Sequence, residues 1–126
     1  FVFLCLDKGG VKKLIVEKLE EWEIAFIDVG MGVELVEQSL LGVLRITTST
    51  DKQRQHVATK HRIPFSDGDG NDEYSRNIQI ADLNALNAAL AVVKWKKLYG
   101  FYHDLENEYF STYTIDGNML TNEDQP

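Results

Sequence analysis

The stretch Phe1-Val-Phe-Leu-Cys-Leu-Asp7-Lys-Gly-Gly10 decides the fold that the sequence predicts. Its apolar run without polar alternation is typical of a strand covered on both faces, as the central strands of parallel sheets are. The run ends at Asp7 and two glycines. Because open α/β sheets bind ligands just beyond the carboxyl ends of their strands, Asp7 is the first candidate for a functional residue. The alternative is that Asp7 caps the helix that follows.

A helical period replaces the continuous apolar run after Asp7, which predicts an amphipathic helix over residues 10–22. Its apolar face is formed by Val11, Leu14, Ile15, Leu19 and Trp22. A second short apolar strand begins at Ile24 and ends in Asp28, followed by Gly30-Met-Gly32, which we interpret as a tight turn. Strand, helix and strand predict a right-handed βαβ unit with a parallel pair. Asp28, a weaker site candidate than Asp7, is then expected at the same edge of the sheet.

The remainder of the chain favours antiparallel strands and one long helix. Residues 33–37 and 43–48 predict a hairpin, and residues 51–60 a modest helix. We expect a mobile loop over residues 66–76, because this polar stretch has no apolar anchor to offset the entropy of ordering it. Further elements are predicted at residues 78–100 (an Ala/Leu-rich helix), 108–115 with 119–121 (a final hairpin) and 122–126 (a frayed tail).

Composition limits the classes of partner and compartment. The 126 residues make one domain, and a net charge of −7 argues against nucleic acid or an anionic membrane as the main partner. No apolar run has the length of a membrane span. The single cysteine, Cys5, excludes an internal disulfide and is expected to be a buried, inert thiol, which suits a reducing cytoplasm. The chain lacks an initial Met and opens inside a strand, so we expect it to be a piece of a longer protein.

Motifs for metal binding and nucleophilic catalysis are incomplete or missing. Residues 67–72 resemble the start of an EF-hand loop, but Asp72 stands where glycine is required and Ile78 where a bidentate Glu is required. The histidines His56, His61 and His103 lack metal-ligand spacing and are expected at the surface. No hydrolase, zinc-protease or Walker motif is found.

The order of the predicted elements resembles the second half of the adenylation domain of ThiF, MoeB and the ubiquitin-activating enzymes. The resemblance rests on the strand end at Asp7, the step Ile27-Asp-Val-Gly30 and the long helix with Leu83-Asn-Ala-Leu-Asn-Ala-Ala-Leu90. It implies an α/β fold, a Rossmann-like half-domain in which a parallel βαβ pair is followed by antiparallel strands, a long C-terminal helix and a final hairpin. The family's strand commonly ends Asp-Asn-x-x-x-Arg. Here Lys8 replaces the Asn and Lys12 the Arg.

The resemblance implies an ATP-dependent adenylyltransferase that activates the C-terminal carboxylate of a small ubiquitin-like or sulfur-carrier protein. It places Asp7 as a catalytic residue near Mg²⁺ and ATP, and Lys12 in contact with the nucleotide. The family's phosphate-binding glycine turn lies before its equivalent of this chain, so the fragment alone is expected to be inactive. The family's zinc-binding cysteines are missing, which implies an enzyme without zinc. We also expect a homodimer, through an apolar arc of the long helix that carries Leu83, Leu86, Ala89, Leu90 and Val93.

Two other functions remain open on the residues alone. The chain could be a non-catalytic dimerisation or interaction module, with Asp7 only a helix cap. It could also be the second half of a dinucleotide-binding oxidoreductase. The residues that precede Phe1 would separate the three.

Overall fold

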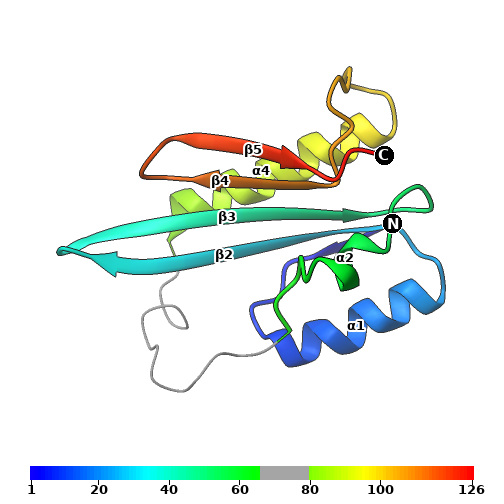
Figure 1. Cartoon of the computed structure of the whole chain (residues 1–126), viewed down its shortest axis with the longest axis horizontal. Coiled ribbons are helices and arrows are strands. Elements are labelled where there is room, and N and C mark those ends of the chain that lie inside the picture. Colours follow the sequence, from blue (N-terminus) through cyan, green and yellow to red (C-terminus); the bar gives the residue numbers. More distant parts are fainter. Residues whose placement is uncertain (66–79) are drawn as a thin grey trace.

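A mixed five-stranded sheet forms the centre of the protein (Figure 1). The computed structural model describes residues 1–65 and 80–126, so the predicted loop 66–76 and the EF-hand-like residues 67–72 lie outside the described residues. The strands follow the sheet in chain order and are β1 (Val2–Leu4), β2 (Phe26–Val36), β3 (Ser39–Ser49), β4 (Phe110–Thr114) and β5 (Met119–Glu123). Only β1 and β2 are parallel; each later pair is antiparallel. The helices are α1 (Gly9–Glu21), α2 (His56–Thr59) and α4 (Ala81–Leu98). This confirms the predicted α/β fold with a parallel pair, antiparallel strands, a long helix and a final hairpin.

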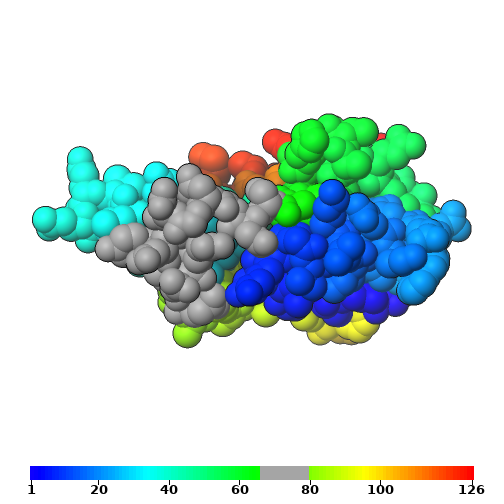
Figure 2. Space-filling model, turned by 90° about the horizontal axis from the view of Figure 1, so that it is seen from below, coloured from blue at the N-terminus to red at the C-terminus, as the bar shows by residue number. Residues whose placement is uncertain are grey.

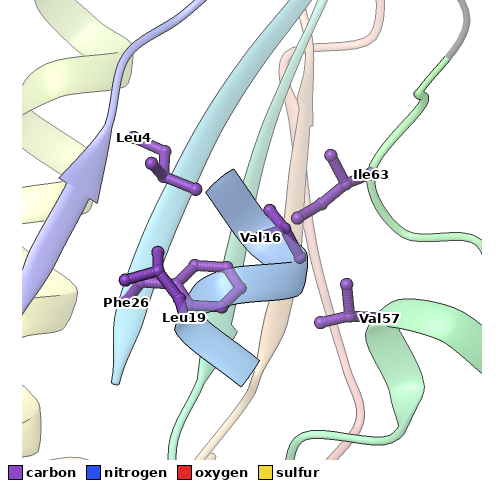
Figure 3. Close-up of a cluster of buried hydrophobic side chains, with 6 residues drawn as sticks. All are labelled: Leu4, Val16, Leu19, Phe26, Val57 and Ile63. Carbon is purple, nitrogen blue, oxygen red and sulfur yellow. The ribbon is translucent and has the colours of Figure 1, made fainter. Parts of the chain in front are cut away.

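Helices lie on both faces of the sheet because residues next to each other in β2 point in opposite directions. Phe26 belongs to an apolar cluster with α1 and α2. Figure 3 shows Val16 and Leu19 of α1 among Leu4, Phe26, Val57 and Ile63. Ile27, the next residue, packs with Ile46 and with Ala91 of α4. The sheet is therefore the middle layer between α1 and α2 on one side and α4 on the other.

The interpretation of Gly30-Met31-Gly32 as a turn was wrong. Both glycines lie within β2, where Gly30 pairs with Arg45 and Gly32 with Val43. The turn comes later, at Glu37 and Gln38, whose φ values of 48° and 71° are those of a type I′ hairpin. Glycine is also compatible with extended backbone, and the long pairing with β3 favours that state here. The resulting hairpin projects at one end of the molecule, in cyan in Figure 2.

The first strand is shorter and less covered than its apolar run predicted. β1 has 3 residues and is an edge strand among the described elements. Its Phe3 is 39 % exposed and touches the ring of Trp95, with the ring centroids 5.9 Å apart. Cys5 was expected to be buried, but it lies beyond the end of β1 and is exposed.

Each long helix buries only part of the face that was expected, together with residues outside that face. α1 buries Gly9, Lys12, Val16 and Leu19, while Leu14 is 66 % and Trp22 63 % exposed. α4 buries Leu83, Asn87, Ala91 and Lys94, and leaves Leu86, Val92 and Val93 more than a third exposed. In both helices a polar side chain with a buried partner takes a position that hydrophobicity would give to an apolar residue. No helix in the described part of the chain is long and apolar enough to cross a membrane.

The end of the chain is held in place, although a frayed tail was expected from residue 122. β5 continues through Glu123, and Asp124 is only 7 % exposed. Its carboxylate accepts hydrogen bonds from Lys60 and Arg62, which follow α2. These ionic contacts between distant segments cannot be recognised from the local composition of the tail.

Candidate functional site

Asp7 lies past the carboxyl end of β1, in the segment that leads to α1. Its side chain is exposed and makes no hydrogen bond or ion pair with the rest of the described chain. The N-cap of α1 is Lys8, whose side chain makes no capping hydrogen bond in the described part of the chain. Asp7 therefore does not cap the helix, and its carboxylate faces solvent at the position where α/β sheets bind ligands.

A buried ion pair joins the first turns of α1 to β2 beside this strand end. Lys12 Nζ lies 2.9 Å from Oδ1 of Asp28 and 3.4 Å from the carbonyl oxygen of Val29. The side chains of Lys12 and Asp28 are 7 % and 3 % exposed. Leu4, the last residue of β1, is the partner of Asp28 in the parallel register. Asp28 thus lies within the sheet rather than at its edge, and the structure brings it together with Lys12 instead of with Asp7.

The environment of Asp28 contains more positive than negative charge. Burial raises the pKa of Asp28, against the charge and hydrogen bonding of Lys12 and the charge of Arg45. Burial also lowers the pKa of Arg45, against the attraction of Asp28. Two cations therefore share one carboxylate, and they have a net charge of about +1 when Asp28 is ionised. The excess charge is local, because the whole chain is acidic.

Arg45 was not predicted as a site residue, and it lies across the bare backbone of Gly30. A methyl group built on Gly30 would come within 2.9 Å of Nη2, 3.1 Å of Nε and 3.3 Å of Cζ of Arg45. The guanidinium makes no hydrogen bond or direct ion pair within the described ranges. A glycine opposite a long cationic side chain in a β-ladder is the one sequence signal for this contact, since glycine in a strand often marks a close approach.

A cluster around His56 is a structural contact between distant parts of the chain. His56 was expected at the surface, but it is 3 % exposed, with Nδ1 3.1 Å from Asp124 and Nε2 2.8 Å from the carbonyl oxygen of Thr48. Both ring nitrogens are therefore occupied, which leaves neither for a metal or a substrate.

No group of three or more His, Cys, Asp or Glu side chains is arranged to hold a metal ion among residues 1–65 and 80–126. Asp7 could therefore offer a metal its own carboxylate, with other ligands from a substrate or from water. Comparisons of the sequence with protein-family models and with curated proteins give no match.

Proposed function

We propose that the chain is part of an ATP-dependent adenylyltransferase similar to ThiF and the ubiquitin-activating enzymes, with a Rossmann-like half-domain. Its substrate would be the C-terminal carboxylate of a small ubiquitin-like or sulfur-carrier protein. The observation that supports this most directly is the exposed, unpaired carboxylate of Asp7 at the carboxyl end of β1. The net positive charge around Asp28, on the strand that pairs with β1, suits a substrate that carries phosphates.

The exposed carboxylate of Asp7 fits one part of a site for a magnesium nucleotide. Magnesium is usually held by one or two carboxylates together with substrate phosphates and water, and Asp7 supplies one such carboxylate. Bound magnesium would neutralise phosphate charge during transfer. We propose that Lys12 contributes to nucleotide binding through its positive charge, because its ammonium group is paired with Asp28. The exposed thiol of Cys5 is compatible with a reducing cytoplasm, which we propose as the location.

The test is ATP–pyrophosphate exchange by the longest natural form of the protein, with its carrier protein present. Asp7→Asn removes the charge and keeps the size of the side chain. We expect the exchange rate to fall at least about a hundredfold, the scale of losing one positioned electrostatic group. Asp116→Asn, in the exposed turn before β5, is the matched control and should leave the rate unchanged. A rate for Asp7→Asn within about threefold of wild type would remove Asp7 from the site.

Self-association is a second part of the proposal, supported by the outer face of α4. Leu86, Val92 and Val93 are 37 %, 41 % and 39 % exposed on this helix. We propose that two copies bury this face against each other as a homodimer. Light scattering at tens of micromolar should give the mass of two chains, and Val93→Asp should give one. A monomeric wild-type protein at that concentration would contradict the proposal.

A further inference from the structure

We propose that Arg45, whose guanidinium lies close to Gly30, forms an oxyanion-binding site on the face of the sheet that carries α1. Gly30 and Arg45 are cross-strand partners, so their side-chain positions lie on the same face as Asp28, which is two residues from Gly30 along β2. The site is thus next to the buried Lys12–Asp28 pair. It does not depend on adenylyl transfer, because it concerns binding by the chain itself.

The N–H donors of the Arg45 guanidinium have no acceptor among the described residues. A guanidinium offers five N–H donors in a planar fork, and Arg45 donates none of them to an acceptor among the described residues. Arg45 is partly buried, and burial is the main influence on its pKa. A bound oxyanion would supply the missing acceptors through two parallel hydrogen bonds.

The charges of Lys12, Arg45 and Asp28 do not balance. Asp28 is the only carboxylate that attracts Arg45 in the described part of the chain. Lys12 Nζ lies 2.9 Å from Oδ1 of the same carboxylate. One cation of the three groups therefore lacks a counter-charge. An anion beside Arg45 would balance it, whereas a cation or a neutral ligand would not.

The contact between Arg45 and position 30 depends on the absence of a side chain at Gly30. Any larger residue at position 30 would occupy the space through which the guanidinium passes, since its Cβ would lie 2.9 Å from Nη2. At Gly32, two residues along the same strand, an added Cβ meets nothing within 4 Å. A side chain at position 30 would therefore displace the end of Arg45, and Gly32 provides a matched control.

The ligand class is a planar or tetrahedral oxyanion, either a peptide C-terminal carboxylate or a phosphate. Three probes separate these sources: N-acetylglycylglycine, its C-terminal amide and inorganic phosphate. Each is titrated at constant ionic strength, and the amide resonances of Gly30 and Arg45 and the Nε–H of Arg45 are followed by NMR. We expect saturable shifts at these groups with the carboxylate, with phosphate or with both, and none with the neutral amide.

The variants separate local recognition from net charge. Arg45→Gln should weaken binding at least about tenfold, because one charge-assisted pair is lost. Lys52→Gln makes the same change in net charge at an exposed site and should have no effect. Gly30→Ala keeps every charge but displaces the fork, and it should weaken binding several-fold while Gly32→Ala does not. Circular dichroism of each variant establishes that it is folded.

Two results would overturn the inference. One is that neither anion shifts the resonances of Gly30 or Arg45 at concentrations up to tens of millimolar. The other is that Arg45→Gln or Gly30→Ala, when folded, binds as tightly as wild type. Binding of phosphate alone or of the carboxylate alone supports the site and identifies the source of its ligand.

Discussion

Nδ1 of His56 lies 3.1 Å from Oδ2 of Asp124, a carboxylate 68 residues further along the chain. The other ring nitrogen, Nε2, lies 2.8 Å from the carbonyl oxygen of Thr48. Both ring nitrogens of His56 therefore contact acceptor atoms, one on β3 and one at the end of β5. Lys60 and Arg62 bind the same carboxylate. Asp124 therefore joins three side chains from the segment around α2, His56, Lys60 and Arg62, to the end of β5.

Replacing Asp124 by Asn should destabilise the fold strongly. The side chains of His56 and Asp124 are 2 % and 0 % exposed, so the variant removes a buried charge and leaves Lys60 and Arg62 without the carboxylate that they bind. We expect the free energy of unfolding to fall by roughly 3 kcal/mol, as for other broken buried pairs. Urea titration measures the loss. The exposed control Asp116→Asn should change stability by less than about 0.5 kcal/mol, and an equal effect of the two substitutions would contradict this role.

The same carboxylate should make stability depend on acid pH. Burial opposes ionisation of Asp124, but hydrogen bonds from Lys60 and Arg62 and the charges of Arg62 and His56 outweigh it, so its pKa is lowered. The unfolded chain then binds the proton more readily. The stabilisation is complete above the ordinary Asp pKa of about 3.9 and is lost as pH falls through the lowered value.

Unfolding free energies measured between pH 2 and pH 6, about two units either side of the ordinary Asp pKa, test this dependence. Wild type should lose stability toward the acid end more steeply than Asp124→Asn. Parallel pH profiles for the two proteins would show that Asp124 does not contribute.

The Lys12–Asp28 pair should be costly to break and much less costly to remove. Lys12→Met leaves Asp28 buried with only the more distant Arg45, and we expect a loss of about 3–5 kcal/mol. Lys12→Met with Asp28→Asn removes both charges and should recover a large part of that loss. A double-mutant cycle measured by urea titration gives the coupling energy. Additive effects of the two substitutions would mean that the pair does not interact.

The contribution of Asp28 to stability should depend on pH in the opposite direction to that of Asp124. Its pKa is raised by burial, so between the ordinary and the raised value the folded state binds more protons than the unfolded state. Stability from this group therefore falls as pH rises through that interval. Comparing Lys12→Met with the double variant between pH 4 and about pH 7 should show this slope only where Asp28 is present.

Gly42 should tolerate no side chain, in contrast to Gly32 on the facing strand. A Cβ on Gly42 would lie 2.5 Å from Cδ1 of Ile115 and 3.0 Å from Cδ1 of Leu83. Gly42→Ala should therefore cost about 1–3 kcal/mol, the usual range for overpacking. Gly32→Ala meets nothing within 4 Å and should be neutral or slightly stabilising. Thermal unfolding of both variants compares them, and equal melting temperatures would contradict the packing argument.

The sequence predicted the order of the elements because hydrophobic period and turn chemistry are local. The step from β1 through α1 to β2, the pairing of β2 with β3 and the final hairpin all follow from such signals. What it could not give was the environment of each element. The apolar run around Cys5 reads as a core strand, yet a run alone does not show how many neighbours cover it.

The candidate site residues also differ in whether a local sequence signal or a tertiary contact places them. Asp7 could be located from its place after a strand, and its exposure agrees with that reading. Lys12 and Asp28 could not be paired, because a buried ion pair is set by tertiary contact and its lysine falls on a helix face that hydrophobicity assigns to solvent. Arg45 carries no motif at all, and only its register with Gly30 indicates a role.

The β2–β3 hairpin also bears on the order in which the chain folds. Its two strands are neighbours in sequence, and their pairing from Val36 with Ser39 to Phe26 with Ser49 closes outward from a two-residue turn. Contacts of such short sequence separation cost little loop entropy and form early. The parallel β1, by contrast, must wait for α1 to cross over, and the contact of Asp124 with His56 closes a far longer loop. We therefore expect the hairpin to form before the two helical layers and the end of the chain pack onto it.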